Sequence, residues 1–92
     1  MTNFHETQMG NITRVVPVDL SDGDFVDENG FFIRCGTEGT LKYCPVGNAD
    51  SEAIIKTFEA SNKFADPEQC RKIFATGGGS PQADDIYVGY GI

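Results

Sequence analysis

The sequence predicts an all-β protein, either a small sandwich or an open barrel of about six strands, preceded by a flexible N-terminal arm. Three observations support this prediction. The apolar residues lie in short runs of roughly four to eight residues, and several runs alternate with polar residues as in half-buried strands. Eleven glycines and four prolines separate these runs, more than a helical bundle would tolerate. At 92 residues, the chain is long enough for only one domain.

The chain begins with residues 1–11, which are polar, lack hydrophobic periodicity and are expected to form the flexible arm. Residues 12–92 are expected to form the single β domain. Its first strand is expected over residues 12–20. Pro17 cannot donate a hydrogen bond to a sheet, so this strand should lie at an edge or be bulged or broken. An acidic connection rich in turn-forming residues is expected over residues 21–29.

A β-hairpin is predicted over residues 31–44. Its two halves alternate, and a Gly-Thr-Glu-Gly turn at residues 36–39 joins them, because glycine reaches positive φ without a steric penalty. In the first half, one face is expected to carry Phe31, Ile33 and Cys35, and the other Phe32 and Arg34. In the second half, one face is expected to carry Leu41 and Tyr43, and the other Lys42 and Cys44.

Later segments supply the remaining strands. Residues 54–58 carry β-branched and aromatic side chains at strand spacing, which favours a strand, although Asp50 or Ser51 could instead cap a helix. A loop is expected over residues 62–69, with a helical turn that Pro67 could begin. The other segments are a turn at 45–48, a strand at 71–76, a flexible glycine-rich loop at 77–82 and a final strand at 85–90.

So short a chain can bury only a thin core, so we expect added stability from a homo-oligomer or from docking onto a larger partner. Phe31 and Phe74 could each face such a partner instead of the interior. The residues expected to supply the core are Phe31, Ile33, Phe58, Ile73, Phe74, Ile86 and Val88.

Composition limits the possible partners. The formal net charge is −7 and no basic stripe is present, which argues against nucleic acid and against an anionic membrane surface. No export signal or membrane-spanning stretch is evident. An odd number of cysteines, Cys35, Cys44 and Cys70, favours buried, reduced thiols in a protein made in the cytosol. Whether the first two share a sheet face depends on the turn register.

No motif carries a catalytic set, so we expect a non-enzyme with no cofactor and no metal. His5 has no positioned partner, and the cysteines lack the paired spacing of zinc sites. The acidic residues 19–28 lack the ligand order of an EF-hand, and residues 77–80 lack the lysine of a P-loop. Asp84 and Asp85 are adjacent, so on a strand they would point to opposite faces and could not share a proton transfer.

Three motifs stand out in the second part of the chain. They are Phe-Ile-Arg-Cys-Gly-Thr-Glu-Gly-Thr-Leu-Lys (32–42), Cys-Arg-Lys-Ile-Phe-Ala-Thr-Gly (70–77) and Ala-Asp-Asp-Ile-Tyr-Val-Gly-Tyr-Gly (83–91). Together they resemble a group of small tailed-bacteriophage structural proteins, which have a strand ending in Gly-Thr-x-Gly, a penultimate strand ending in Ala-Thr-Gly and a final Asp-Ile strand. The resemblance covers about residues 30–92, and Gly89 and Gly91 depart from a more apolar ending.

The resemblance implies a virion structural protein of the head decoration (cement) or head-spike base type. Such a protein would be made in the host cytoplasm, form a homo-oligomer and bind the major capsid protein or other virion subunits. If so, Phe4, Met9 and Ile12 of the arm region are the candidate partner-binding residues. The alternatives are a neck or tail component of the virion, or a small acidic cytoplasmic interaction or inhibitor module that mimics nucleic acid.

Overall fold

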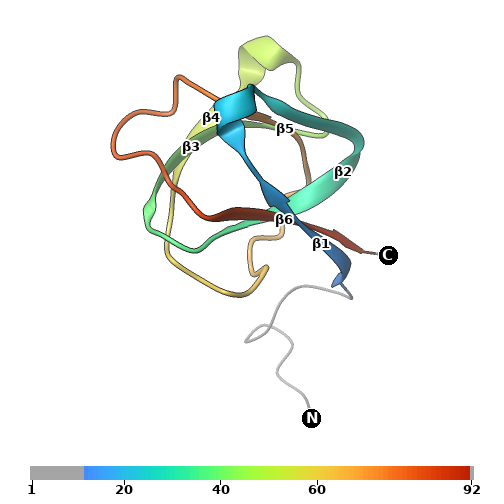
Figure 1. Ribbon diagram of the computed structural model, residues 1–92. Helices are drawn as coiled ribbons and strands as arrows, with labels where there is room; N and C mark the ends of the chain where they lie inside the picture. The colour runs from blue at the N-terminus through green and yellow to red at the C-terminus, as the bar shows by residue number, and fades with distance from the viewer. Residues whose placement is uncertain (1–11, 92) are drawn as a thin grey trace.

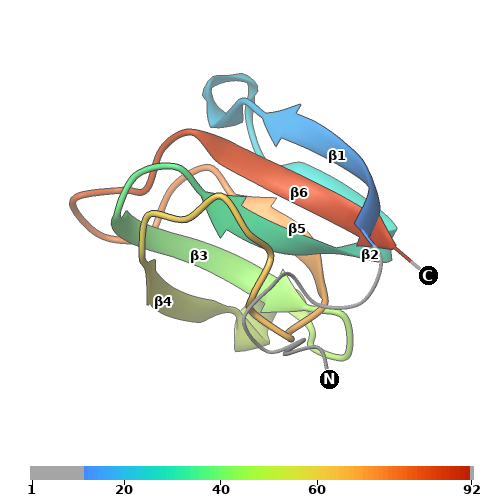
Figure 2. The same cartoon turned by 90° about the horizontal axis from the view of Figure 1, so that it is seen from below.

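The computed structural model describes residues 12–91 and is all-β, which confirms the predicted fold class. The strands within this range are β1 (Ile12–Val18), β2 (Phe25–Cys35), β3 (Gly39–Pro45), β4 (Ile54–Phe58), β5 (Cys70–Phe74) and β6 (Ile86–Gly91). These six strands of the described chain form one open, antiparallel sheet in the order β1-β6-β2-β5-β3-β4. The sheet curls around a central core (Figure 1), with β1 at one end of the sheet and β4 at the other (Figure 2).

β2 belongs to both halves of the curled sheet. Its first part pairs with β5 through Phe25 and Phe31, and its last four residues, 32–35, pair with β6. The register shifts between Val26 and Phe31, and within this interval Gly30 adopts a φ of 92°, which glycine reaches without steric cost. Gly30 therefore lies in a bulge that bends a continuous strand, and the chain does not reverse there.

The acidic connection expected over residues 21–29 is shorter than predicted, because β2 already begins at Phe25. The Phe25 ring packs edge-on against Phe31, with 5.1 Å between centroids, and this contact holds the acidic stretch in the sheet. Between β1 and β2 the chain makes only a short 3-10 turn at Leu20–Asp22, capped by the Asp19 carboxylate.

The predicted hairpin over residues 31–44 is wrong, because β2 and β3 do not pair with each other and β5 lies between them. The end of β2 pairs with β6, whereas β3 pairs with β5 and β4, so the turn connects the two halves of the sheet. Residues 36–38 cross between the halves, and the Gly36 N–H donates to the Asp85 carbonyl at 2.8 Å. The predicted inward faces are confirmed, since the buried core includes Phe31, Ile33, Cys35, Leu41 and Tyr43.

The other predicted elements lie close to their expected positions. β1 is an edge strand that pairs only with β6, as Pro17 predicts. Residues 54–58 form β4, and the alternative helix is reduced to a 3-10 turn at Asp50–Glu52. Residues 62–69 are a loop without the helical turn suggested at Pro67. β5 and β6 lie near the segments that the sequence predicts for the last two strands.

Phe74 is the expected core residue that the structure places elsewhere. It is half-buried on the outer face of β5, between the ammonium groups of Lys72 and Lys42, 4.6 and 5.0 Å from its ring centroid. Adjacent strand residues face opposite sides, so the neighbouring Ile73 takes the core position instead. The other expected core residues are buried, namely Phe31, Ile33, Phe58, Ile73, Ile86 and Val88.

A second apolar cluster lies outside the main core. Phe64, in the loop between β4 and β5, is 1% exposed and packs on the outer face of β6 at Gly89. A Cβ on Gly89 would lie 2.9 Å from Cζ of Phe64. The Arg34 guanidinium lies 5.3 Å from the Phe64 ring centroid and 4.2 Å from that of Tyr87. The glycine in the last strand therefore provides the space in which the loop docks.

An ionic network fastens the turn before β4 to β5. The Asp50 carboxylate accepts hydrogen bonds from Lys72 at 2.9 Å and from Arg71 at 2.6 Å, and these bonds hold the pKa of Asp50 below its ordinary value of 3.8. Arg71 also donates to the Asn48 carbonyl at 2.9 Å and reaches the Cys44 sulfur at 3.3 Å. The network thus covers Cys44, which lies on the outer face of β3 yet is fully buried.

Ile73→Ala should lower the free energy of unfolding by about 2–5 kcal/mol, because it empties a fully buried position in the centre of the core. Chemical denaturation measures this change. The matched control is Ile55→Ala, where the side chain is 58% exposed and the cost should stay within about 0.5 kcal/mol. Equal, small effects of both substitutions would contradict the inward position of Ile73.

Gly89→Val should displace Phe64 and lower the free energy of unfolding by about 1–3 kcal/mol, because the added side chain occupies the docking space. Hydrogen exchange should then become faster across residues 59–69. Gly47→Val is the control, since a Cβ at Gly47 meets no atom within 4 Å. Unchanged exchange in the loop of the Gly89 variant would show that Phe64 does not need this space.

Candidate interaction surface

The structure places one of the three predicted partner-binding residues. Ile12 is the first residue of β1, pairs with Gly91 of β6 and is half-buried. Phe4 and Met9 lie outside the described residues. Ile12 Cγ2 would lie 3.0 Å from a Cβ on Gly89, so it borders the Phe64 cluster. The N-terminal segment therefore joins the domain at the outer face of β1 and β6.

This outer face is apolar, and its β1 side is exposed while Phe64 covers Gly89 on its β6 side. Val16 and Val18 of β1 pack against the core, so the alternate residues Val15 and Pro17 point outward. Val15 is 46% exposed, and Pro17 is also exposed. The sheet register places Val15 opposite Gly89 and Pro17 opposite Tyr87. We call the resulting surface the β1–β6 outer face, and its residues are Ile12, Val15, Pro17, Tyr87 and Gly89.

The edge of β1 beside this face is free of strand partners within the described chain, because β1 pairs only with β6. Pro17 has no N–H, so β1 offers an incomplete row of donors to any strand that would add to this edge. Side-chain contacts across the β1–β6 outer face are therefore better suited to binding a partner than backbone pairing along the edge.

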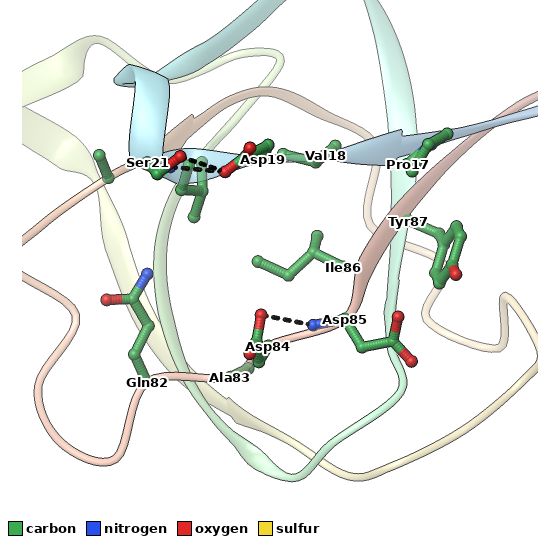
Figure 3. Close-up of a pocket in the computed structure, with 12 residues that line it drawn as sticks. Pro17, Val18, Asp19, Ser21, Gln82, Ala83, Asp84, Asp85, Ile86 and Tyr87 are labelled. Carbon is green, nitrogen blue, oxygen red and sulfur yellow. Dashed lines mark hydrogen bonds between the residues drawn. The ribbon is translucent and has the colours of Figure 1, made fainter.

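A depression of about 590 Å³ lies at the end of the curled sheet, beside the start of β6 (Figure 3). Three segments line it, residues 17–21, residue 75 and residues 82–87. Its walls carry the carboxylates of Asp19, Asp84 and Asp85, so the depression is acidic.

Two of the three carboxylates, those of Asp19 and Asp84, accept hydrogen bonds from nearby residues. Asp19 accepts hydrogen bonds from the Ser21 hydroxyl at 2.6 Å and from its N–H at 2.9 Å, which lower the pKa of Asp19. Asp84 accepts the Asp85 N–H at 2.8 Å, and the two side chains point in different directions (Figure 3). In residues 12–91, no group of three His, Cys, Asp or Glu side chains is placed to hold a metal ion.

The three cysteines are unpaired and buried, as the sequence predicts for thiols in the core. Burial raises the pKa of Cys35 to about 12, with a smaller contribution from the Asp85 charge. Burial likewise raises the pKa of Cys70 to about 12. The Cys44 thiol lies 3.3 Å from the carbonyl oxygen of Asn48, on the opposite face of the sheet from the other two. Their placement suits packing rather than nucleophilic chemistry.

The glycine-rich loop packs against β3. A Cβ on Gly78 would lie 2.9 Å from the Lys42 nitrogen, so only glycine permits this approach. Past the glycines, the Thr40 N–H donates to the Pro81 carbonyl at 2.9 Å, and the Ala83 N–H donates to the Thr40 carbonyl at 3.0 Å. The loop therefore closes one end of the core.

Comparison with protein-family models, curated proteins and solved structures finds no match to this chain. Within the described residues, no helix is long and apolar enough to cross a membrane.

Sequence reasoning identified Ile12 but missed the other residues of the β1–β6 outer face. Val15 and Val16 are adjacent and both apolar, so alternation alone could not tell which of them points outward. Pro17 was considered only for its missing hydrogen-bond donor, not as part of an exposed surface. The alternation of the last strand, in which Tyr87 and Gly89 share a face opposite Ile86, was the available signal.

The thiols should resist alkylation in the native protein and all react after denaturation. Because burial raises the pKa of Cys35 and Cys70 to about 12, almost no thiolate is present at neutral pH. We expect native rates at least about a hundredfold below those of the denatured chain. Mass spectrometry after timed alkylation checks this for each cysteine. Rapid modification of any one thiol, or a stoichiometric Cys35–Cys44 bridge, would contradict the buried, reduced state.

Proposed function

We propose that this chain is a bacteriophage virion structural protein of the head decoration (cement) or head-spike base type, without enzymatic activity. The observation that carries the proposal is the β1–β6 outer face, an exposed apolar surface that begins where residues 1–11 join the domain. The three motif resemblances add support, since the motifs fall on β2 and β3, on β5 and on β6.

The proposed partners are the major capsid protein or other virion subunits, with the protein itself acting as a homo-oligomer in the virion after synthesis in the host cytoplasm. Such a protein acts by mass action. Binding to assembled subunits and not to free ones lowers the free energy of the assembled shell. For this task the domain needs a rigid platform and a complementary surface, both of which a curled sheet with an apolar outer face can supply.

Quantitative mass spectrometry of purified virions tests the proposal directly. A head decoration protein should be present in hundreds of copies per particle, and a spike base in tens. The neck or tail alternative predicts a few copies that co-purify with tails after heads and tails are separated. Absence of the protein from purified virions would refute the virion assignment.

Val15→Asp and deletion of residues 2–11 should each weaken binding to particles that lack the protein. The effect of Val15→Asp should be at least about tenfold, because this substitution buries an unpaired carboxylate in the interface. Co-sedimentation with the particles measures the binding. Val46→Asp is the matched control, since Val46 is 45% exposed against 46% for Val15 but lies in the turn after β3. Thermal unfolding of each variant shows that the domain remains folded.

Two outcomes would refute this surface assignment. Equal effects of the Val15 and Val46 substitutions would mean that the β1–β6 outer face has no special role. Unchanged binding after deletion of residues 2–11 would make that segment a passive tail, and unfolding of the deleted chain would make it part of the fold.

A further inference from the structure

Phe74 lies at the centre of a second exposed surface, on the outer face of β5 and of the strands beside it. Its ring is half-buried, and Val26 of β2 is 50% exposed on the same face. Val26 points outward because the preceding residue, Phe25, packs against the core. Exposed apolar side chains that gather on one face indicate an interaction surface. We call this surface the Phe74 face, and its residues are Asp24, Val26, Lys42, Lys72 and Phe74.

The Phe74 face carries opposite charges on its two sides. On the β3 side, Lys42 pairs with Phe74, and its ammonium lies 5.0 Å from the ring centroid. This ammonium forms no ion pair within residues 12–91. On the β2 side, the register places Asp24 beside Phe74, where its carboxylate accepts the Ala75 N–H at 2.7 Å and its side chain stays 40% exposed. One row across the sheet therefore reads cation, aromatic ring, carboxylate.

We propose that the Phe74 face binds the same face of a second copy of this chain, about a two-fold axis that runs along β5 through Phe74. Rotation about this axis exchanges the two sides of the face, so Lys42 of each copy lies opposite Asp24 of the other. The two Phe74 rings then meet between two identical ion pairs. A two-fold axis across the strands would instead bring Lys42 against its own counterpart.

A second copy fits this face because the chain supplies the complement of its own charges. Lys42 forms no ion pair within the described part of its own chain, and the Asp24 side chain remains accessible on the other side of the ring. A row with a cation at one side and a carboxylate at the other is self-complementary under a two-fold rotation, as a symmetric interface requires. The exposed part of Phe74 and the Val26 side chain supply apolar surface to the same contact.

Two features limit the strength of this contact. Lys72 lies on β5 and approaches its counterpart, although its ammonium is already paired with Asp50 at 2.9 Å and with Asp24 at 3.7 Å in its own chain. The curled sheet presents a convex outer face, and a net charge of −7 opposes the approach of two copies. We therefore expect a weak, reversible dimer that buries less than about 1,200 Å² in total.

The β1–β6 outer face lies on other strands, so a dimer formed through the Phe74 face leaves it open. The inference names a contact for the homo-oligomer of the proposed function, but it does not rest on the virion assignment. Self-association is measured on the isolated full chain. Its absence would leave the virion assignment to the particle measurements, and absence of the protein from virions would leave the dimer standing.

Sedimentation velocity and nuclear magnetic resonance at increasing protein concentration test the proposal. The sedimentation coefficient should rise with concentration, and the amide signals of residues 24–26, 42 and 72–74 should shift in parallel. A chain that stays monomeric up to about 1 mM would overturn the proposal. Concentration-dependent shifts confined to other strands would overturn it as well, because the contact would then lie elsewhere.

Lys42→Glu and Asp24→Lys should each weaken self-association at least about tenfold, because each substitution places like charges opposite each other in both ion pairs. An equimolar mixture of the two variants should associate again, since both pairs of the mixed dimer join opposite charges. Asp24→Asn keeps an acceptor for the Ala75 N–H and replaces the lysine variant if thermal unfolding shows that variant to be unstable. Its mixture with the Lys42 variant should associate more tightly than the Lys42 variant alone.

Arg14→Glu is the matched control for Lys42→Glu. It changes the net charge by the same amount and removes a cation that also lies 5.0 Å from a ring centroid, that of Tyr90, but on β1 outside the Phe74 face. Self-association should be unchanged in this variant. Equal weakening by the Arg14 and Lys42 substitutions would mean that net charge alone controls association. That result, or a mixture of the charge-reversed variants that fails to associate, would refute the two-fold contact.

Discussion

The bend in β2 is the constraint on which the rest of the structure depends. This one strand pairs with both β5 and β6, so the sheet curls around a single core instead of lying flat. Phe31 lies at the bend, fully buried, with ring centroids of Phe25 and Tyr90 at 5.1 and 6.4 Å. Gly30 permits the bend, because its φ is positive and a Cβ there would lie 2.5 Å from the Gln69 side chain.

The curled sheet also has an outer face, and part of it is covered by another segment of the chain. On β6, Gly89 has no side chain, and Phe64 from the loop between β4 and β5 packs into the space this leaves. The buried Phe64 ring also contacts the Arg34 guanidinium, which lies between this ring and that of Tyr87. Beside this cluster no described loop covers Val15, and the apolar β1–β6 outer face remains open to a partner. The outer face of β6 thus receives the Phe64 loop, and the neighbouring outer face of β1 is the proposed partner surface.

Much of the fold could be predicted because the inward face of a strand depends on neighbouring residues alone. Alternation correctly assigned the faces of β2 and β3, and Pro17 correctly placed β1 at an edge. Strand pairing could not be predicted in this way, because the two strands that pair with β2, namely β5 and β6, lie far from it in the sequence. The position of Phe74 was predicted wrongly, because Ile73 and Phe74 are adjacent and both apolar, so alternation does not show which of them faces the core. For the candidate surface, the sequence suggested Ile12, but it could not indicate that Phe64 and Tyr87 lie beside Arg34, because these rings belong to other elements.

The basic residues show how an acidic chain supports a thin core. All seven lie in the described part of the chain, and five of them stack on aromatic rings, namely Arg14, Arg34, Lys42, Lys56 and Lys72. Long cationic side chains cover apolar surface with their stems while the charged group stays near water, and each such contact contributes about 0.5–1 kcal/mol at an exposed site. The five cations therefore contact five aromatic rings, with Lys42 and Lys72 near the same ring, Phe74, and Arg34 near both Phe64 and Tyr87. The net negative charge of the chain opposes non-specific association with other anions.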